Sequence, residues 1–149
     1  MISDLFSATV LIGILASGVR LATPYLYAAI GETFGQRSGV LNLGVEGQML
    51  LGAFAAFYVA FTTGSLWLGV LTAMVVGALM GLTMAYVTVN LNAEQGISGI
   101  GFFLFGLGMS DLLFQKLLGT VETVKGFPKI YLPGLSDIPG IGLGRGGRF

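Results

Sequence analysis

The sequence contains no cysteine and no histidine among its 149 residues. Without cysteine it forms no disulfide bond and offers no thiol nucleophile, and without histidine it lacks the commonest metal ligand and general base. A phosphate-binding glycine loop is not expected either, because the glycine-rich run 138–147 follows no strand and opens no helix. These absences predict a protein with no catalytic residues, no metal site and no cofactor.

Charged side chains are also scarce, at 9% of the chain against about 25% in soluble proteins. The 7 basic and 7 acidic residues cancel to a net charge of zero, which argues against nucleic acid as a partner. By contrast, 54% of the residues are hydrophobic and the mean hydropathy is +0.88. Because so little polar surface cannot cover a globule in water, the composition predicts a chain surrounded by the lipid bilayer.

Apolar residues gather in four segments, at about residues 5–30, 40–63, 66–91 and 97–118. At about 1.5 Å per residue, each is long enough to cross a hydrocarbon core of roughly 30 Å as a helix. Arg20 and Pro24 interrupt the first segment, which forms either one helix or two. The short turn Gly64-Ser65 predicts an antiparallel hairpin between the second and third segments.

The expected fold is therefore all-α, a polytopic transmembrane helical bundle of about four spans. The transmembrane region covers residues 1–118, and residues 119–149, rich in glycine and proline, form a loop or tail.

One carboxylate stands where lipid is expected, in the first turns of the second segment. An acidic residue at mid-helix costs roughly 2.5–3.5 kcal/mol in hydrocarbon, so Glu46 must face protein, water or a ligand. Asn42, four residues earlier, shares its face if the segment is helical from residue 40. We predict that both face the bundle interior. Either Glu46 forms a structural ion pair with Arg20, or it lines a solute pathway with Asn42 and Gln48.

Asp111 raises the same question midway through the fourth segment, one turn before Gln115. It pairs with Lys116 or snorkels with it toward the interface, or it contributes to the solute pathway. Glu32 and Arg37 fall in the connection between the first two segments, where we expect both to be solvated.

Small residues form a smooth stripe on the third segment. Ala73, Gly77, Gly81 and Ala85 recur every four residues, a pattern that favours close helix packing within the bundle or, as a second possibility, between two copies. Gly31, Gly35 and Gly39 have the same spacing but surround polar residues, which favours a turn or helix break there.

A family resemblance rests on the stretch 23–56, TPYLYAAIGETFGQRSGVLNLGVEGQMLLGAFAA. It carries Gly31-Glu32, Arg37-Ser38-Gly39 and Asn42-Leu43-Gly44-Val45-Glu46-Gly47 in that order. In this it resembles the permease subunits of ABC-type importers, in the branch that takes up nucleosides and simple sugars and is related to ribose and branched-chain amino acid permeases. Weaker likenesses follow in 94–99, EQGISG, and in 132–140, LPGLSDIPG.

The resemblance implies a multi-pass protein of a prokaryotic plasma (inner) membrane that performs no chemistry itself. Its implied partners are an ATP-binding subunit, an extracytoplasmic solute-binding protein and a second permease subunit, and its substrate is a nucleoside or, second, a simple sugar. Family permeases are longer and carry a coupling segment that this sequence lacks, so we expect a truncated copy, a fragment or half of a split permease.

Two other classes stay open on the residues alone. One is an ion- or proton-coupled carrier in which Glu46 or Asp111 titrates. The other is a small membrane assembly protein whose helices pack on a partner through the stripe of Ala73, Gly77, Gly81 and Ala85.

Overall fold

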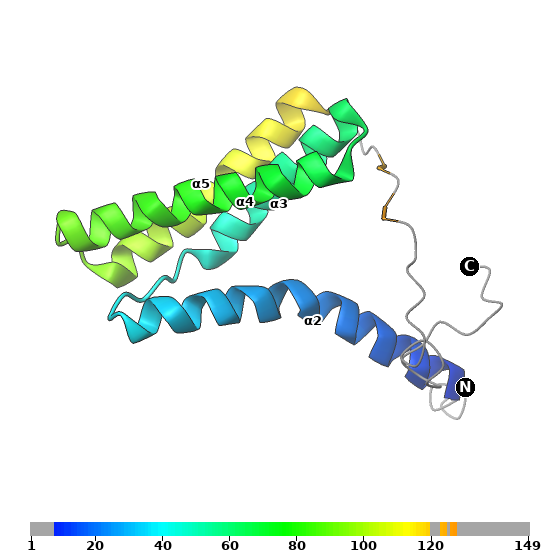
Figure 1. Ribbon diagram of the computed structural model, residues 1–149, viewed down its shortest axis with the longest axis horizontal. Helices are drawn as coiled ribbons and strands as arrows, with labels where there is room; N and C mark the ends of the chain where they lie inside the picture. The colour runs from blue at the N-terminus through cyan, green and yellow to red at the C-terminus, as the bar shows by residue number, and fades with distance from the viewer. Residues whose placement is uncertain (1–7, 120–122, 125, 128–149) are drawn as a thin grey trace. The chain divides into compact units, whose positions relative to one another are not determined.

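The computed structural model describes residues 8–119, 123–124 and 126–127 (Figure 1). This part of the chain contains helices and no strand, which confirms the all-α class. The elements are α2 (Ala8–Arg37), α3 (Val45–Thr63), α4 (Leu66–Ala85), the π-helix η1 (Tyr86–Asn90) and α5 (Gln95–Leu117). Four helical stretches are long and apolar enough to cross a membrane, in agreement with the four expected spans: Val10–Arg37, Val45–Thr63, Leu66–Asn90 and Gln95–Leu117.

The chain divides into two units within α2. The part of this helix up to Tyr27 belongs to the first unit, and the second unit, Ala28–Phe127, contains the end of α2 and all later helices. The candidate site lies in the second unit.

The first apolar segment forms a single helix that includes Pro24 and continues to Arg37. The expected break at Gly31 and Gly35 is wrong, because the helix runs through both. It stops only before Gly39, whose φ of 85° is the left-handed conformation that glycine adopts without strain.

The second helix starts later than predicted, at Val45 rather than near residue 40. Asn42 therefore precedes the helix, and the expectation that Asn42 and Glu46 share a helical face is wrong. The cause is local: the Oδ1 atom of Asn42 accepts a hydrogen bond of 3.0 Å from the Gly44 backbone N–H, the turn that asparagine forms in competition with a helix. We call residues 38–44, between α2 and α3, the linking segment.

The predicted hairpin of the second and third segments is present as α3 and α4. Gly64 ends α3 with a φ of 69°, and the side chain of Ser65 caps α4 by accepting from the Leu68 N–H. The two helices approach closely at Gly69, where a Cβ atom would stand 2.8 Å from the carbonyl oxygen of Ala56. Glycine at this position allows the antiparallel helices to pack backbone to backbone.

The third span differs from one continuous α-helix at its end. After Ala85 the backbone forms the π-helix η1, in which Thr88 is buried and its hydroxyl donates to the carbonyl of Met84 at 2.9 Å. Asn92 follows with a φ of 53°, a conformation that asparagine tolerates better than most residues. This reversal leads directly into α5, which begins at Gln95 with Glu94 as its N-cap.

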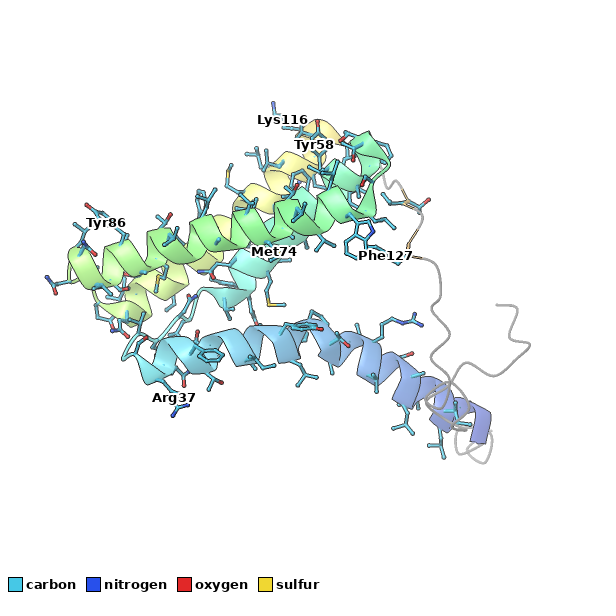
Figure 2. The ribbon with its side chains drawn as sticks, in the orientation of Figure 1. Arg37, Tyr58, Met74, Tyr86, Lys116 and Phe127 are labelled. Atoms are coloured by element: carbon cyan, nitrogen blue, oxygen red, sulfur yellow. The ribbon has the colours of Figure 1, made fainter. Side chains whose placement is uncertain are left out.

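Helices α3, α4 and α5 pack against one another, and α3 contacts both of the others extensively (Figure 1). Tyr58 and Lys116 lie at one end of this three-helix group and Tyr86 at the opposite end, as Figure 2 shows. Amphipathic rings at both ends suit the two membrane–water interfaces. Beyond α5, the ring of Phe127 packs edge-on against Trp67 with centroids 5.5 Å apart. Residues 128–149, most of the predicted loop or tail, lie outside the described residues.

Candidate functional site

The linking segment runs alongside the first half of α5. A Cβ atom on Gly99 would stand 2.8 Å from the Cβ of Leu43, and one on Gly44 would stand 2.7 Å from the Cβ of Phe102. One helical turn further, a Cβ on Gly106 would overlap the backbone of Gly47. The contacts thus advance in the same direction along both stretches, so the linking segment and the start of α3 run parallel to α5.

This register places the start of α3 level with the middle of α5. From Gln95 to Gly106, α5 rises by about 16 Å at 1.5 Å per residue, which is about half the length of this helix. The linking segment therefore runs without a helix beside the first half of α5, while α3 itself, Val45–Thr63, is long enough to cross a membrane. Non-helical backbone beside a span is a recurring feature of solute sites in transporters.

Gln95, the first residue of α5, binds the linking segment through both ends of its side-chain amide. Its Oε1 accepts from the Leu41 backbone N–H at 2.7 Å, and its Nε2 donates to the Gly39 carbonyl at 3.1 Å. Gln95 does not stand out in the sequence. The only signal was the likeness of residues 94–99 to the permeases, which carries no information about what the side chain contacts.

Glu32 holds the next backbone amide of the segment. Its Oε1 accepts from the Asn42 N–H at 2.9 Å and from Gln36 Nε2 at 3.2 Å. The residue is half-buried near the end of α2, so the expectation of a solvated side chain holds only in part, whereas Arg37 is exposed as expected. A carboxylate that accepts a backbone N–H forms a charge-assisted bond, stronger than a neutral one.

Asn42 and Gln48, two of the predicted pathway residues, are in direct contact. The Nδ2 of Asn42 donates to the Oε1 of Gln48 at 3.1 Å. The Nε2 atom of Gln48 is buried and has no hydrogen-bond partner among the described residues. A buried amide donor without a partner is costly unless water or a ligand completes it. The pair therefore offers a polar group at the point where α3 begins.

Glu46 lies beside this pair in sequence but does not join it. It is exposed in the first turn of α3, where the helix dipole favours a negative charge, and it forms no ion pair within the described residues. The three helices α3 to α5 do not bury it. Arg20 belongs to the other unit, so the ion pair with Glu46, and the interior position of Glu46, stay predictions.

Asp111 lies further along α5, away from the Asn42–Gln48 pair. Its Oδ2 accepts from Gln115 Nε2 at 2.8 Å, and in the described part of the chain it forms no ion pair with Lys116. With Ser110 it borders a groove of about 640 Å³ between α3 and α5, whose aromatic residues are Phe54, Phe57 and Phe114. The structure thus brings Asn42 and Gln48 together and leaves Asp111 apart, and a pathway role for Asp111 stays a prediction.

The four residues of the stripe on α4 are half-buried, but there is open space at its two glycines. Cβ atoms on Gly77 and Gly81 would meet nothing within 4 Å, whereas the Ala73 carbonyl lies 3.7 Å from one on Gly52. The face of α4 that packs on α3 and α5 carries Gly69, Met80 and Met84 instead. Helix packing through Ala73, Gly77, Gly81 and Ala85 stays a prediction, beyond the Ala73 contact.

Comparison with known proteins identifies this arrangement of motifs. Residues 14–138 match the family described as the permease component of branched-chain amino acid transport systems. The chain belongs to this permease family. It is a multi-pass membrane protein, as its four apolar helices and its relatives indicate.

Relatives in the permease family come from archaea and bacteria. The chain is 37% identical over 121 residues to the putative glucose ABC transporter permease protein TsgC13 of Haloferax volcanii, which covers 81% of this chain and 36% of that protein. It is 35% identical over 130 residues to the guanosine ABC transporter permease protein NupQ of Bacillus subtilis, covering 81% and 41%. It is 32% identical over 137 residues to the nucleoside ABC transporter permease protein NupC of Lactococcus lactis, covering 87% and 43%.

The chain thus spans about two fifths of the length of the relatives that it matches. No solved structure matches it.

Proposed function

We propose that this permease chain forms part of the translocation pathway of an ATP-driven importer for nucleosides or simple sugars in a prokaryotic plasma membrane. Relatives that cover most of the chain are named for guanosine, nucleosides and glucose. The observation that carries the proposal within the structure is the Asn42–Gln48 pair at the start of α3, level with the middle of α5. Both solute classes are rich in hydroxyl groups, and nucleobases add further donors and acceptors, which such amides orient by hydrogen bonds.

In this proposal the chain performs no reaction. ATP hydrolysis belongs to a separate ATP-binding subunit, an extracytoplasmic solute-binding protein delivers the solute, and a second permease subunit completes the pathway. The described residues contain no group of three or more His, Cys, Asp or Glu side chains that could hold a metal ion. Uptake by alternating access requires no chemistry from the chain, only polar groups that a solute reaches in turn from the two sides.

Uptake measurements in cells that express the chain with the genes flanking its own test the proposal. We expect uptake of radiolabelled guanosine or glucose that stops when ATP is depleted and does not vary across pH 6 to 8. The solute that is not transported should compete only weakly with uptake of the one that is. This difference identifies the solute class as nucleoside or simple sugar. Uptake that persists without ATP and follows the proton gradient would contradict the proposal and favour a proton-coupled carrier.

A variant of Gln48 connects the uptake to the site. Gln48→Leu removes the buried amide donor that has no partner among the described residues, together with the oxygen that accepts from Asn42, and keeps the side chain large. Because one neutral hydrogen bond contributes about 0.5–1.5 kcal/mol, we expect KM for the solute to rise by about threefold to tenfold. Gln115→Leu on α5 is the matched control, since Gln115 contacts Asp111 and not this pair. Equal KM values in both variants would show that Gln48 does not bind the solute.

A further inference from the structure

We propose that Gln95 is a positioning residue of the pathway: its side-chain amide fixes the linking segment within the membrane and so places Asn42 at the start of α3. The transport part of this inference rests on the proposed function, whereas the placement of the segment does not. Gln95 itself contacts neither member of the Asn42–Gln48 pair, so it acts through the backbone of residues 39 and 41.

The first argument is the position of the segment. It lies beside the first half of α5, a helix apolar enough to cross a membrane, and backbone N–H and C=O groups outside a helix find no water in surrounding lipid. Such groups are tolerated only where protein satisfies them or where they line an aqueous cavity. Three bonds from two side chains meet this need: Gln95 binds Gly39 and Leu41, and Glu32 binds Asn42.

The second argument is the chemistry of glutamine. The Gly39 carbonyl needs a donor and the Leu41 N–H needs an acceptor, and a primary amide provides one of each on a single planar group. The side chain thereby pairs with the segment as a neighbouring strand would. Methionine has nearly the same length and no such groups, and glutamate keeps the acceptor but loses the donor.

The third argument is packing, because contacts with α5 hold the linking segment at a second point besides the hydrogen bonds of Gln95. Leu43 and Gly44 lie directly against Gly99 and Phe102 of the same helix. These contacts and the bonds of Gln95 hold the linking segment on both sides of Asn42, which bonds Gln48 from there. Loss of the Gln95 bonds frees the start of the segment, and Asn42 loses its alignment.

Hydrogen–deuterium exchange of the full chain in lipid nanodiscs tests the placement. In Gln95→Met we expect the peptide that covers residues 38–44 to exchange about fivefold to tenfold faster than in the unchanged chain, as the loss of a hydrogen bond implies. Gln95→Glu should lie between the two. Gln115→Met, a glutamine on the same helix, should leave this peptide unchanged. Equal exchange of residues 38–44 in Gln95→Met and Gln115→Met would overturn the proposal.

Uptake kinetics test the positioning role, with permease amounts normalised by immunoblot. We expect Gln95→Met to raise KM with little change in maximal rate per permease, because a misplaced Asn42 weakens solute binding. Gln95→Glu, which retains one of the two bonds, should restore part of the affinity. A lower amount of permease at unchanged KM would show a stability role only and overturn the positioning role. If the unchanged chain supports no uptake, the proposed function fails while the exchange experiment still decides whether Gln95 fixes the segment.

Discussion

At the scale of single residues, the glycines of the motif Asn-Leu-Gly-Val-Glu-Gly are packing positions. Gly44 and Gly47 face α5 so closely that neither has room for a methyl group: a Cβ on Gly47 would stand 2.6 Å from the Phe102 carbonyl oxygen and 2.7 Å from the Phe103 backbone. The neighbouring polar residues, Asn42 and Gln48, bond to one another across the same turn. The motif therefore combines a close helix contact with a polar pair beside it.

Alanine substitutions at two glycines distinguish a glycine that packs against another helix from one that does not. Gly47→Ala forces α3 and α5 apart, and overpacking of this kind costs about 1–3 kcal/mol, so we expect a clearly lower unfolding temperature in detergent. Gly77→Ala on α4 is the matched control, because a Cβ there meets nothing within 4 Å. Since alanine is the better helix former by about 1 kcal/mol, this variant should be unchanged or slightly more stable.

The same pair of variants tests the stripe on α4. A Gly77→Ala chain that loses as much stability as Gly47→Ala would show that another helix, or a second copy of the chain, packs against the stripe. That outcome would confirm the packing role predicted from the sequence and would contradict the open surface expected here.

At the scale of elements, the start of α5 combines two roles within two residues. Glu94 caps the helix, accepting backbone N–H groups of Gly96 and Ile97 at 2.9 and 2.5 Å, and Gln95 binds the linking segment. The π-helix η1 and Asn92, in the left-handed conformation, lead directly to this cap. The start of α5 thus supports the linking segment that precedes α3.

The cap makes helix stability depend on pH. Hydrogen bonds from Ile97 and Gly96 lower the pKa of the Glu94 carboxyl below its ordinary value of 4.5. A lowered pKa in the folded state means that the contribution is present above the unfolded pKa and is lost as pH falls through the folded value. We expect the unfolding temperature to fall as the pH drops below 4.5, and to fall less in Glu94→Gln. Parallel curves for the two proteins would exclude Glu94 as the source.

At the scale of the whole molecule, the described spans alternate in direction with one irregularity. The hairpin α3–α4 turns at Gly64 and Ser65, and α5 returns parallel to α3, so the 91–94 connection and the hairpin turn lie at opposite ends of the three-helix group. Helix α3 begins level with the middle of α5, so the linking segment runs beside the first half of α5 without a helix.

The absence of cysteine makes this topology directly testable, because an introduced cysteine is the only thiol in the chain. We expect Thr63→Cys and Ala93→Cys to react with a membrane-impermeant maleimide from opposite sides of the membrane. Labelling of intact cells and of inverted vesicles gives the two accessibilities. Reaction of both from the same side would contradict the arrangement of α3, α4 and α5 as crossing spans.

The all-α class, the four apolar spans and the α3–α4 hairpin follow from the amino-acid sequence alone, because hydropathy and turn chemistry depend on neighbours in the chain. The sequence also named Asn42 and Gln48 together as candidate polar residues. It did not predict that α3 begins at Val45, that α2 continues through Gly31 and Gly35, or that Glu32 is bound by the Asn42 backbone. The contacts of Gln95 join residues 54 and 56 positions apart. These features depend on the packing of the helices. A backbone group outside a helix bonds to whichever side chain the packing brings within reach, and its neighbours in the sequence do not specify that partner.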